Sequence, residues 1–339
     1  MSVNTKVKDG VLHNLGVDVK ILDIDTGKEV NYNPGLCRDP KGNLWISIRS
    51  CIHNPDRWEG WEHPNHYQNF LSIGILDEKT LKIKDLKEVV PEEEYPGFQW
   101  GIEDVRLFWR KDGLHGIGVS IPIDKGGYAI RQAEILIDYE KGTYRLIKDH
   151  GRPFGHQEKN WSPSESPNPY FDFIYSPTQI VKDGEVIGEM NDLFIHNGTP
   201  LIPYENGYLS VGHVVTQVHQ ERTYAQIALK WDKTGKLIEH SQFFHFNVGW
   251  RENLEETIEF VSGMVWDKKK ENLIVGIGVK DEITGIAVVS PDKFKWEPYE
   301  DATWYAWNWD SPPNREELPT PEPTKGLACR HTALSRPQA

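Results

Sequence analysis

The stretch from Gly101 to Phe108, GIEDVRLF, contains the residues of the chain that are best suited to chemistry. Glu103, Asp104 and Arg106 stand where an apolar strand pattern begins. Burying charge without a partner costs several kcal/mol, so such residues are expected to be paired or used. A carboxyl group held in a cleft beside another titratable group is a candidate general acid. The stretch therefore predicts a functional cluster at the head of a strand.

Four other stretches share the outline of this one, which is a polar cluster, an apolar strand, a turn and a second apolar strand. The five stretches are 31–49, 102–120, 160–176, 196–213 and 260–278. Their starts are roughly 40 to 70 residues apart, which fits one four-stranded propeller blade with insertions. Long amphipathic helical patterns are nearly absent. We predict an all-β fold, a single five-bladed β-propeller over residues 1–310 with four-stranded antiparallel blades around a central channel.

The innermost strands of a propeller line its channel, so polar residues at the five strand heads should converge on one pocket. Beside the Glu103–Arg106 cluster, the candidates are Asn33, Arg49, Lys159, Asn160, Trp161, His196, Thr199, His213, Glu259 and Asp281. Carboxylates, amides, cations and a tryptophan together suit a polyhydroxylated substrate, because aromatic faces stack on sugars and polar groups bind hydroxyls. The cationic candidates for an anion site are Arg49, Arg106, Lys159 and His213.

These same residues carry a resemblance to a known family. GIEDVRLF resembles the Glu-Asp-Pro-Arg signature of glycoside hydrolase family 130, the β-mannoside phosphorylases and β-mannosidases, with Val105 in place of the proline. NGTPLIPYENGYLSVGHV and FVSGMVWDKKKENLIVGIGVKD are similar to two later strand pairs of that family. EKNWSP resembles a motif of the wider set of five-bladed glycosidase-like and glycosyltransferase-like propellers. The resemblance covers about residues 30–290.

The resemblance implies that Asp104 is the proton donor to the leaving glycosidic oxygen, directly or through a sugar hydroxyl. For this role the carboxyl group of Asp104 must be protonated at the working pH, so its pKa must be raised. Burial and Glu103 would raise it, whereas Arg106 would lower it. The resemblance also implies that Arg49, His213 and, less closely, Lys159 hold inorganic phosphate, which attacks the sugar with inversion.

In a hydrolytic variant of the reaction, a second carboxylate activates water instead of phosphate. Asp281, Glu259 and Glu165 are the candidates for it, at roughly 6.5–9.5 Å from the acid. Related hydrolases with three carboxylates have an aspartate where this chain has Asn33, so that pattern is not satisfied. The predicted function is inverting cleavage of a β-linked glycoside, a mannoside, by phosphate or water.

Two other functions stay open at this point. A glycosyltransferase on the same scaffold would use a sugar phosphate or sugar nucleotide as donor, and the cationic residues suit it equally well. A non-catalytic glycan-binding propeller would bind sugars without turnover. For single residues the structural alternatives are an ion-pair network around Asp104, packing for Trp161, a buried hydrogen-bonded role for His213 and a turn cap for Asp281.

Composition limits the partners and the compartment. The net charge of -13 disfavours nucleic acid and anionic membranes as partners. Cys37, Cys51 and Cys329 are too few and too scattered for a disulfide framework or a zinc cluster. We expect no metal site and no cofactor besides phosphate as a co-substrate. The N-terminal residues lack the apolar core of a signal peptide, so a cytoplasmic location is predicted.

Two segments fall outside the repeated outline. Residues 53–69 contain Trp58 and Trp61 and are predicted to be an aromatic insertion that folds over the pocket and contacts a distal sugar. Residues 311–339 are rich in proline and polar residues and are predicted to be an extended or disordered tail.

Overall fold

A computed structural model describes residues 13–53, 67–124, 127–150, 159–165, 167–175, 179–183, 185–190, 195–218, 221–248, 258–299 and 304–306. Within these ranges the regular secondary structure is almost entirely β-strand. The only helical elements there are two short 3₁₀ turns, η3 (Pro96–Phe98) and η4 (Pro291–Lys293). The predicted all-β class is confirmed. No helix in the described ranges is both long enough and apolar enough to span a membrane.

One eight-stranded sheet contains the GIEDVRLF stretch. Its strands, in spatial order, are β3 (Val30–Arg38), β4 (Leu44–His53), β5 (Tyr67–Leu76), β6 (Ile83–Pro91), β12 (Thr143–His150), β11 (Arg131–Asp138), β8 (Gly113–Ser120) and β7 (Glu103–Arg110). The pairing is antiparallel except between β6 and β12. The two end strands meet again, because the Asn33 side-chain amide on β3 donates to the Asp104 carboxylate on β7 at 2.8 Å. The sheet is therefore nearly closed on itself.

The remaining strands form four further sheets. The second eight-stranded sheet consists of β1 (His13–Asp18), β22 (Phe244–Asn247), β20 (Glu221–Asp232), β19 (Gly207–Val218), β17 (His196–Asn197), β18 (Ile202–Tyr204), β21 (Leu237–Ser241) and β26 (Trp296–Pro298). A five-stranded sheet consists of β13 (Ser162–Pro163), β14 (Phe173–Tyr175), β15 (Gln179–Lys182), β16 (Glu185–Met190) and β27 (Trp304–Ala306). A four-stranded sheet consists of β2 (Lys20–Ile21), β25 (Ile283–Val289), β24 (Leu273–Val279) and β23 (Glu259–Trp266), and a small hairpin of β9 (Ile123–Asp124) and β10 (Gly127–Tyr128).

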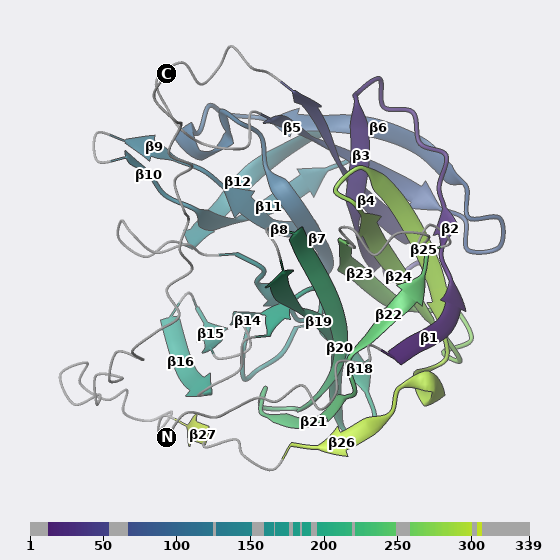
Figure 1. Cartoon of the computed structure of the whole chain (residues 1–339). Coiled ribbons are helices and arrows are strands. Elements are labelled where there is room, and N and C mark those ends of the chain that lie inside the picture. The colour runs from purple at the N-terminus through teal and green to yellow at the C-terminus, as the bar shows by residue number, and fades with distance from the viewer. Residues whose placement is uncertain are drawn as a thin grey trace, which may run out of the picture.

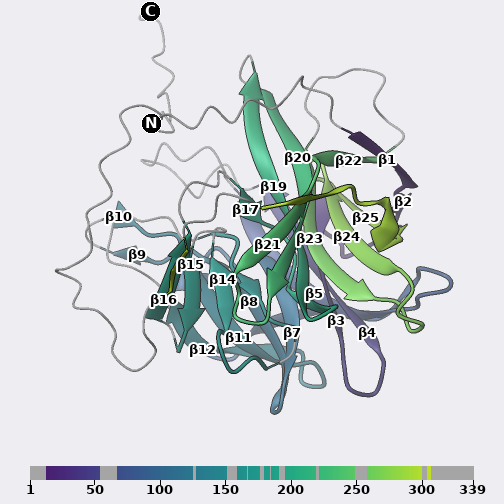
Figure 2. The same cartoon turned by 90° about the horizontal axis from the view of Figure 1, so that it is seen from below.

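Strands from the two ends of the chain complete sheets formed by its middle. β2 pairs with β25 in the last sheet, β1 pairs in parallel with β22, and β27 pairs with β16. Such pairing ties distant parts of the sequence together, and Figure 1 shows the sheets arranged around the middle of the molecule. Figure 2 shows the long β19–β20 hairpin rising beyond the other strands on one side.

Each of the five stretches that share an outline contains an antiparallel strand pair. The pairs are β3–β4, β7–β8, β13–β14, β17 and β18 with β19, and β23–β24. The first strands of these pairs contact one another. Ser164 beside β13 bridges in parallel to Leu201 beside β18, and the Ser262 hydroxyl on β23 donates to the Pro34 carbonyl on β3 at 3.1 Å. The strand heads are thereby held at one common end.

The first two strand heads are irregular in the same way. The pairing register shifts between Tyr32 and Gly35 on β3, and again between Glu103 and Arg106 on β7. Asn33 and Asp104, inside these bulges, have positive φ angles of 50° and 51°. A bulge re-aims a side chain, and a positive φ on a residue other than glycine is strained. Both features are typical of a functional site.

The close approach of β3 to β7 depends on Gly35. A Cβ atom there would lie 2.2 Å from the Val105 carbonyl oxygen and 2.4 Å from the Ser47 hydroxyl. Because the first of these is backbone, we expect Gly35→Ala to lower the free energy of unfolding by about 1–3 kcal/mol in urea denaturation. Gly285→Ala is the control, since its Cβ would meet a Val19 side-chain methyl that can rotate away. An equal loss in both variants would contradict the proposed close contact.

Several predicted features lie outside the described residues. Residues 54–66, with Trp58 and Trp61, make up most of the predicted aromatic insertion. The predicted tail also lies outside, since nothing after residue 306 is described. Both stay predictions.

Candidate active site

Asp104 lies at the meeting point of side chains from two strand pairs. One of its carboxylate oxygens accepts a hydrogen bond from the Asn33 side-chain amide at 2.8 Å and another from Arg49 Nη1 at 2.9 Å. Asn33 comes from the head of β3 and Arg49 from the paired strand β4. Asn33 and Arg49, each more than 50 positions from Asp104 in the sequence, thus hold its carboxylate. The structure brings these three predicted residues together.

The ionisation of Asp104 is decided by its neighbours. Burial by itself would raise the pKa of Asp104. The guanidinium groups of Arg49 and Arg106 and the hydrogen bonds from Asn33 and Arg49 outweigh burial, so the pKa lies below its ordinary value of 3.8. The sequence did not decide whether burial or the cations dominate the pKa of Asp104, and in the structure the cations dominate. Asp104 is a carboxylate in the free protein at neutral pH.

Arg49 joins Asp104 to a second carboxylate. Its Nη2 lies 3.3 Å from Glu103 Oε1, and its Nε donates to the Asn69 side-chain oxygen at 2.8 Å. The Asn69 amide donates in turn to Glu103 at 3.3 Å. The guanidinium group also lies over the Tyr32 ring, 4.9 Å from its centroid. Arg49 is therefore fixed from several sides, and burial, which lowers its pKa, is outweighed by the two carboxylates.

Arg106 is completely buried and holds three strand heads together. It donates to the Gly198 carbonyl at 2.6 Å, to the Asp104 carbonyl at 3.0 Å and to the Asn160 side-chain oxygen at 2.9 Å. Burial lowers the pKa of Arg106 to about 10, against the opposing charge of Asp104, so it stays protonated at neutral pH. Its donors are directed at protein oxygens, which suits a role in positioning the site.

His213 lies beside this cluster in an aromatic environment. Its ring is 5.0 Å from Tyr224, 5.1 Å from Phe260 and 5.6 Å from His196, measured between ring centroids. Burial first, and then the nearby His196 and Arg106, lower its pKa well below the ordinary value. His213 is therefore a neutral imidazole. Its Nδ1 is buried and has no hydrogen-bond partner among the described residues.

Three predicted site residues are buried in structural contacts instead. Trp161 packs against His150 and Phe173 in a small core cluster. The Thr199 hydroxyl accepts from the Val211 backbone at 2.9 Å and donates to the Pro200 carbonyl. A Glu259 carboxylate oxygen accepts the Phe246 backbone N–H at 3.0 Å. These contacts use the groups that the prediction assigned to a substrate.

The other candidates lie nearer to solvent. Lys159 is exposed next to Asn160, and His196 is exposed at the head of β17. Asp281 is exposed in the turn between β24 and β25, with a φ angle of 55°. These three residues are accessible to a ligand at the end where the strand heads meet.

Glu165 lies at the opposite end of its segment from Asn160. Its charge interacts with Arg38 and Lys270, and burial raises its pKa to about 7. Arg38 ends β3, and Lys270 lies in the turn between β23 and β24, so both partners are at the ends of their strands away from the strand heads. Glu165 therefore lies away from the Asp104 cluster, and its role as a second carboxylate stays a prediction.

Sequence reasoning missed Asn69, Tyr32 and Tyr224. Asn69 is in the middle of β5 and contacts both Arg49 and Glu103. Tyr32 precedes the strand-head residue Asn33, and Tyr224 is on β20. Asn69 and Tyr224 are on strands outside the predicted pairs, so the repeat outline gave no signal for them. Only Tyr32 lies within a stretch that the pattern selected.

Comparisons with known proteins agree on the fold. No protein-family model matches the chain, and no curated protein sequence matches it. Among solved structures, β-1,2-mannobiose phosphorylase from Listeria innocua, in complex with β-1,2-mannobiose, is similar with a TM-score of 0.56 and 13% identity, over 81% of this chain and 95% of that one.

Two further structures give the same result. One is described as belonging to the GH130 family of mannoside phosphorylases, containing glycoside hydrolases that target β-1,2-mannosidic linkages in Candida mannan, with a TM-score of 0.56, 13% identity and 78% and 85% of the two chains covered. A glycosyl hydrolase from Bacteroides ovatus has a TM-score of 0.52, 13% identity and 81% and 87% coverage. This chain has the fold of the glycoside hydrolase family 130 mannoside phosphorylases and related glycosidases, at a sequence identity that marks it as divergent.

Proposed function

We propose that the chain is a carbohydrate-active enzyme that cleaves a β-linked mannoside with inversion. The nucleophile is inorganic phosphate or water, and Asp104 delivers the proton to the leaving oxygen. The observation that carries this proposal is Asp104 itself, held in a strained bulge by Asn33 and Arg49 in a chain with the fold of mannoside phosphorylases. Strain of this kind persists where the surroundings fix it, as at active sites.

The lowered pKa of Asp104 means that this residue must take up a proton before it can act as the acid. A carboxylate can accept a hydrogen bond from a sugar hydroxyl but has no proton to donate by itself. Once protonated, Asp104 gives its proton to the oxygen of a sugar hydroxyl while that hydroxyl gives its own proton to the leaving glycosidic oxygen, so that the hydroxyl is restored and Asp104 ends as a carboxylate. Direct donation needs the same protonated form, so in both routes the substrate complex must raise the Asp104 pKa above its value in the free protein.

The residues that could bind phosphate are the cationic side chains that a ligand can reach. Arg106 is completely buried, whereas the Arg49 side chain is 10% exposed and Lys159 is exposed, and His213 is neutral. We propose that Arg49 and Lys159 supply the positive charge for phosphate and that His213 adds a neutral hydrogen bond. An anion that draws Arg49 away from Asp104 also weakens the interaction that lowers the Asp104 pKa. Phosphate binding and proton uptake by Asp104 are thereby linked.

We further propose that the sheets are five four-stranded blades of a propeller. The nearly closed sheet divides where β6 meets β12 in parallel, since only two residue pairs join these strands. The blades are then β3–β6; β7 with β8, β11 and β12; β13–β16; β19–β21 with β17 and β18 together as the fourth strand; and β23–β25 closed by β2. Inner-strand contacts such as Ser162 to the Thr199 carbonyl at 2.6 Å and Ser262 to Pro34 support this grouping.

The experiment is a product assay with β-1,2-mannobiose in the presence and absence of inorganic phosphate. Mannose 1-phosphate in the phosphate-containing reaction indicates phosphorolysis, and mannose alone indicates hydrolysis. An α-configured product, detected by NMR before anomers equilibrate, supports inversion. Transfer of mannose from a sugar nucleotide without cleavage of any β-mannoside would instead favour a transferase. Sugar binding without turnover would favour a non-catalytic role.

A further inference from the structure

A second concave site lies away from Asp104. It has a volume of about 640 Å³ and is lined by the β3–β4 turn, by β6 and β7 and by the β11–β12 turn. Trp109 on β7 is five residues beyond Asp104, which corresponds to about 16 Å along the strand. Figure 2 shows the β3–β4 and β7–β8 turns on the side opposite to the raised β19–β20 hairpin. The site therefore opens on a different face of the molecule.

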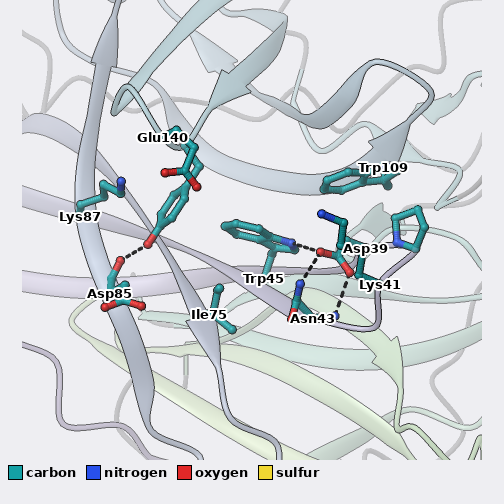
Figure 3. A pocket seen from close by; sticks show the side chains of 11 residues that line it. Asp39, Lys41, Asn43, Trp45, Ile75, Asp85, Lys87, Trp109 and Glu140 are labelled. Carbon is teal, nitrogen blue, oxygen red and sulfur yellow. Dashed lines mark hydrogen bonds between the residues drawn. The ribbon is translucent and has the colours of Figure 1, made fainter.

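Three aromatic rings line this site in fixed positions. Trp45 and Tyr139 are in edge-to-face contact, with ring centroids 4.9 Å apart and an interplanar angle of 75°. The Trp45 indole N–H donates to Asp39 at 3.1 Å, and the Tyr139 hydroxyl donates to the Asp85 carbonyl. In Figure 3, Trp109 lies across the site from Lys87 and Glu140. The rings of Trp45 and Tyr139 are therefore positioned before any ligand arrives, which reduces the entropy cost of binding.

Asp39 organises one wall of the site. Its carboxylate accepts hydrogen bonds from the Asn43 backbone and side chain, both at 2.8 Å, as well as from Trp45. These hydrogen bonds outweigh burial and lower the pKa of Asp39, so it is ionised at neutral pH. A turn held in this way places the exposed residues Lys41 and Asn43 at the rim.

The charges of the site select the class of ligand. The lining contains two lysines and three carboxylates, so its formal charge is −1. These residues are Lys41, Lys87, Asp39, Asp85 and Glu140. This balance disfavours a phosphate-bearing or otherwise anionic ligand. Aromatic rings with surrounding polar groups are the usual lining of a site that binds a small neutral molecule. A pyranose ring has both the C–H faces that pack on indole rings and the hydroxyls that polar rim groups bind.

We propose that this site binds a pyranose unit of a glycan, as a second carbohydrate site separate from Asp104. The aromatic rings of Trp45 and Trp109 pack against the sugar, and Lys41, Asn43 and Glu140 bind its hydroxyls. The proposal goes beyond the proposed function, because it rests on the residues of this site and requires no turnover. In a long glycan substrate, such a site would hold one part of the chain while another part lies at Asp104.

The test is ¹⁹F NMR of the whole protein labelled with 5-fluorotryptophan, titrated with β-1,2-mannobiose and, separately, with cellobiose up to about 50 mM, which saturates a site of millimolar Kd. Single Trp→Phe variants assign the signals. We expect at least one of the two sugars to shift the signals of Trp45 and Trp109. The signal of Trp296, which packs against Phe294 elsewhere in the molecule, should stay in place as the internal control.

Substitutions then locate the binding. Trp109→Ala should abolish the shift of the Trp45 signal, and Glu140→Ala, at an exposed position, should weaken binding about 5-fold without risk to the fold. Turnover of a disaccharide should be unchanged in both variants, so failure of the proposed function is seen separately in the product assay. Signals of Trp45 and Trp109 that stay in place with both sugars would overturn the proposal. A shift that survives both substitutions would overturn it as well.

Discussion

Asp104→Asn is expected to lower kcat for the β-mannoside about 10³-fold, which corresponds to about 4 kcal/mol of transition-state stabilisation. The amide oxygen of asparagine can still accept the hydrogen bonds from Asn33 and Arg49, so the side chain keeps its place. It carries no carboxyl proton to give to the sugar hydroxyl or the leaving oxygen, so the proposed proton transfer is interrupted. Product formation under saturating substrate measures the loss, and sugar binding should change far less than kcat.

The matched control for this variant is Asp77→Asn. Asp77 is also an ionised carboxylate with a basic partner, since its oxygen lies 3.1 Å from Lys84 Nζ. It is in the turn after β5, away from the strand heads, so its substitution should leave kcat unchanged. Turnover in Asp104→Asn at the wild-type rate would refute the assignment of Asp104. Equal losses in the two variants would point to a general effect of lost charge.

The sequence predicted the centre of the site because that centre depends on local pattern. Asn33, Asp104 and Asn160 each stand at the head of a strand pair whose apolar run and turn are visible in the sequence. Once the pairs are recognised as repeats, their heads must converge. This convergence places Asp104 near Asn33 and Arg49, although the pattern does not say which cation pairs with Asp104.

The surroundings of the centre could not be predicted in the same way. Asn69 reaches Arg49 from the third strand, β5, and the register of that strand depends on packing between sheets. A shift of one residue moves every side chain of a strand to the other face. Such a shift occurs on β23 between Val261 and Gly263, just after Glu259, and Glu259 contacts the Phe246 backbone. The face of the sheet on which a strand-head side chain lies is therefore set by packing between sheets, not by the local sequence.

The protonation state of Asp104 could not be predicted from the sequence for a related reason. Sequence adjacency identified Glu103 and Arg106 as its neighbours, but Arg49, 55 positions away, makes the direct ion pair at 2.9 Å. Electrostatic effects depend on distance and burial, which the linear sequence does not contain. This partner makes the free Asp104 a carboxylate, which must be protonated before it can act as an acid.

Arg49→Met is expected to have the largest effect on stability, a loss of about 3–5 kcal/mol at pH 7 in urea denaturation. Arg49 is the shared partner of Glu103 and Asp104, at 3.3 Å and 2.9 Å, and methionine leaves both carboxylates partly buried without it. Arg49→Lys keeps the charge but loses the forked geometry, so its loss should be smaller. Arg131→Met is the control, because Arg131 and Asp149 form a more exposed pair and should contribute about 1 kcal/mol or less.

The pH dependence of this loss tests its cause. In the wild-type protein the pKa of Asp104 is lowered below 3.8. The contribution of Asp104 to the free energy of unfolding is therefore complete above about pH 4 and is lost only as the pH falls below that value. Without Arg49, burial raises the pKa of Asp104, and the cost of the charged group is relieved as the pH falls. Between pH 7 and pH 4 only the second effect operates, and it narrows the difference in free energy of unfolding between wild type and Arg49→Met. A difference that stays constant over this range would show that lost packing, and not the uncompensated carboxylates, causes the destabilisation.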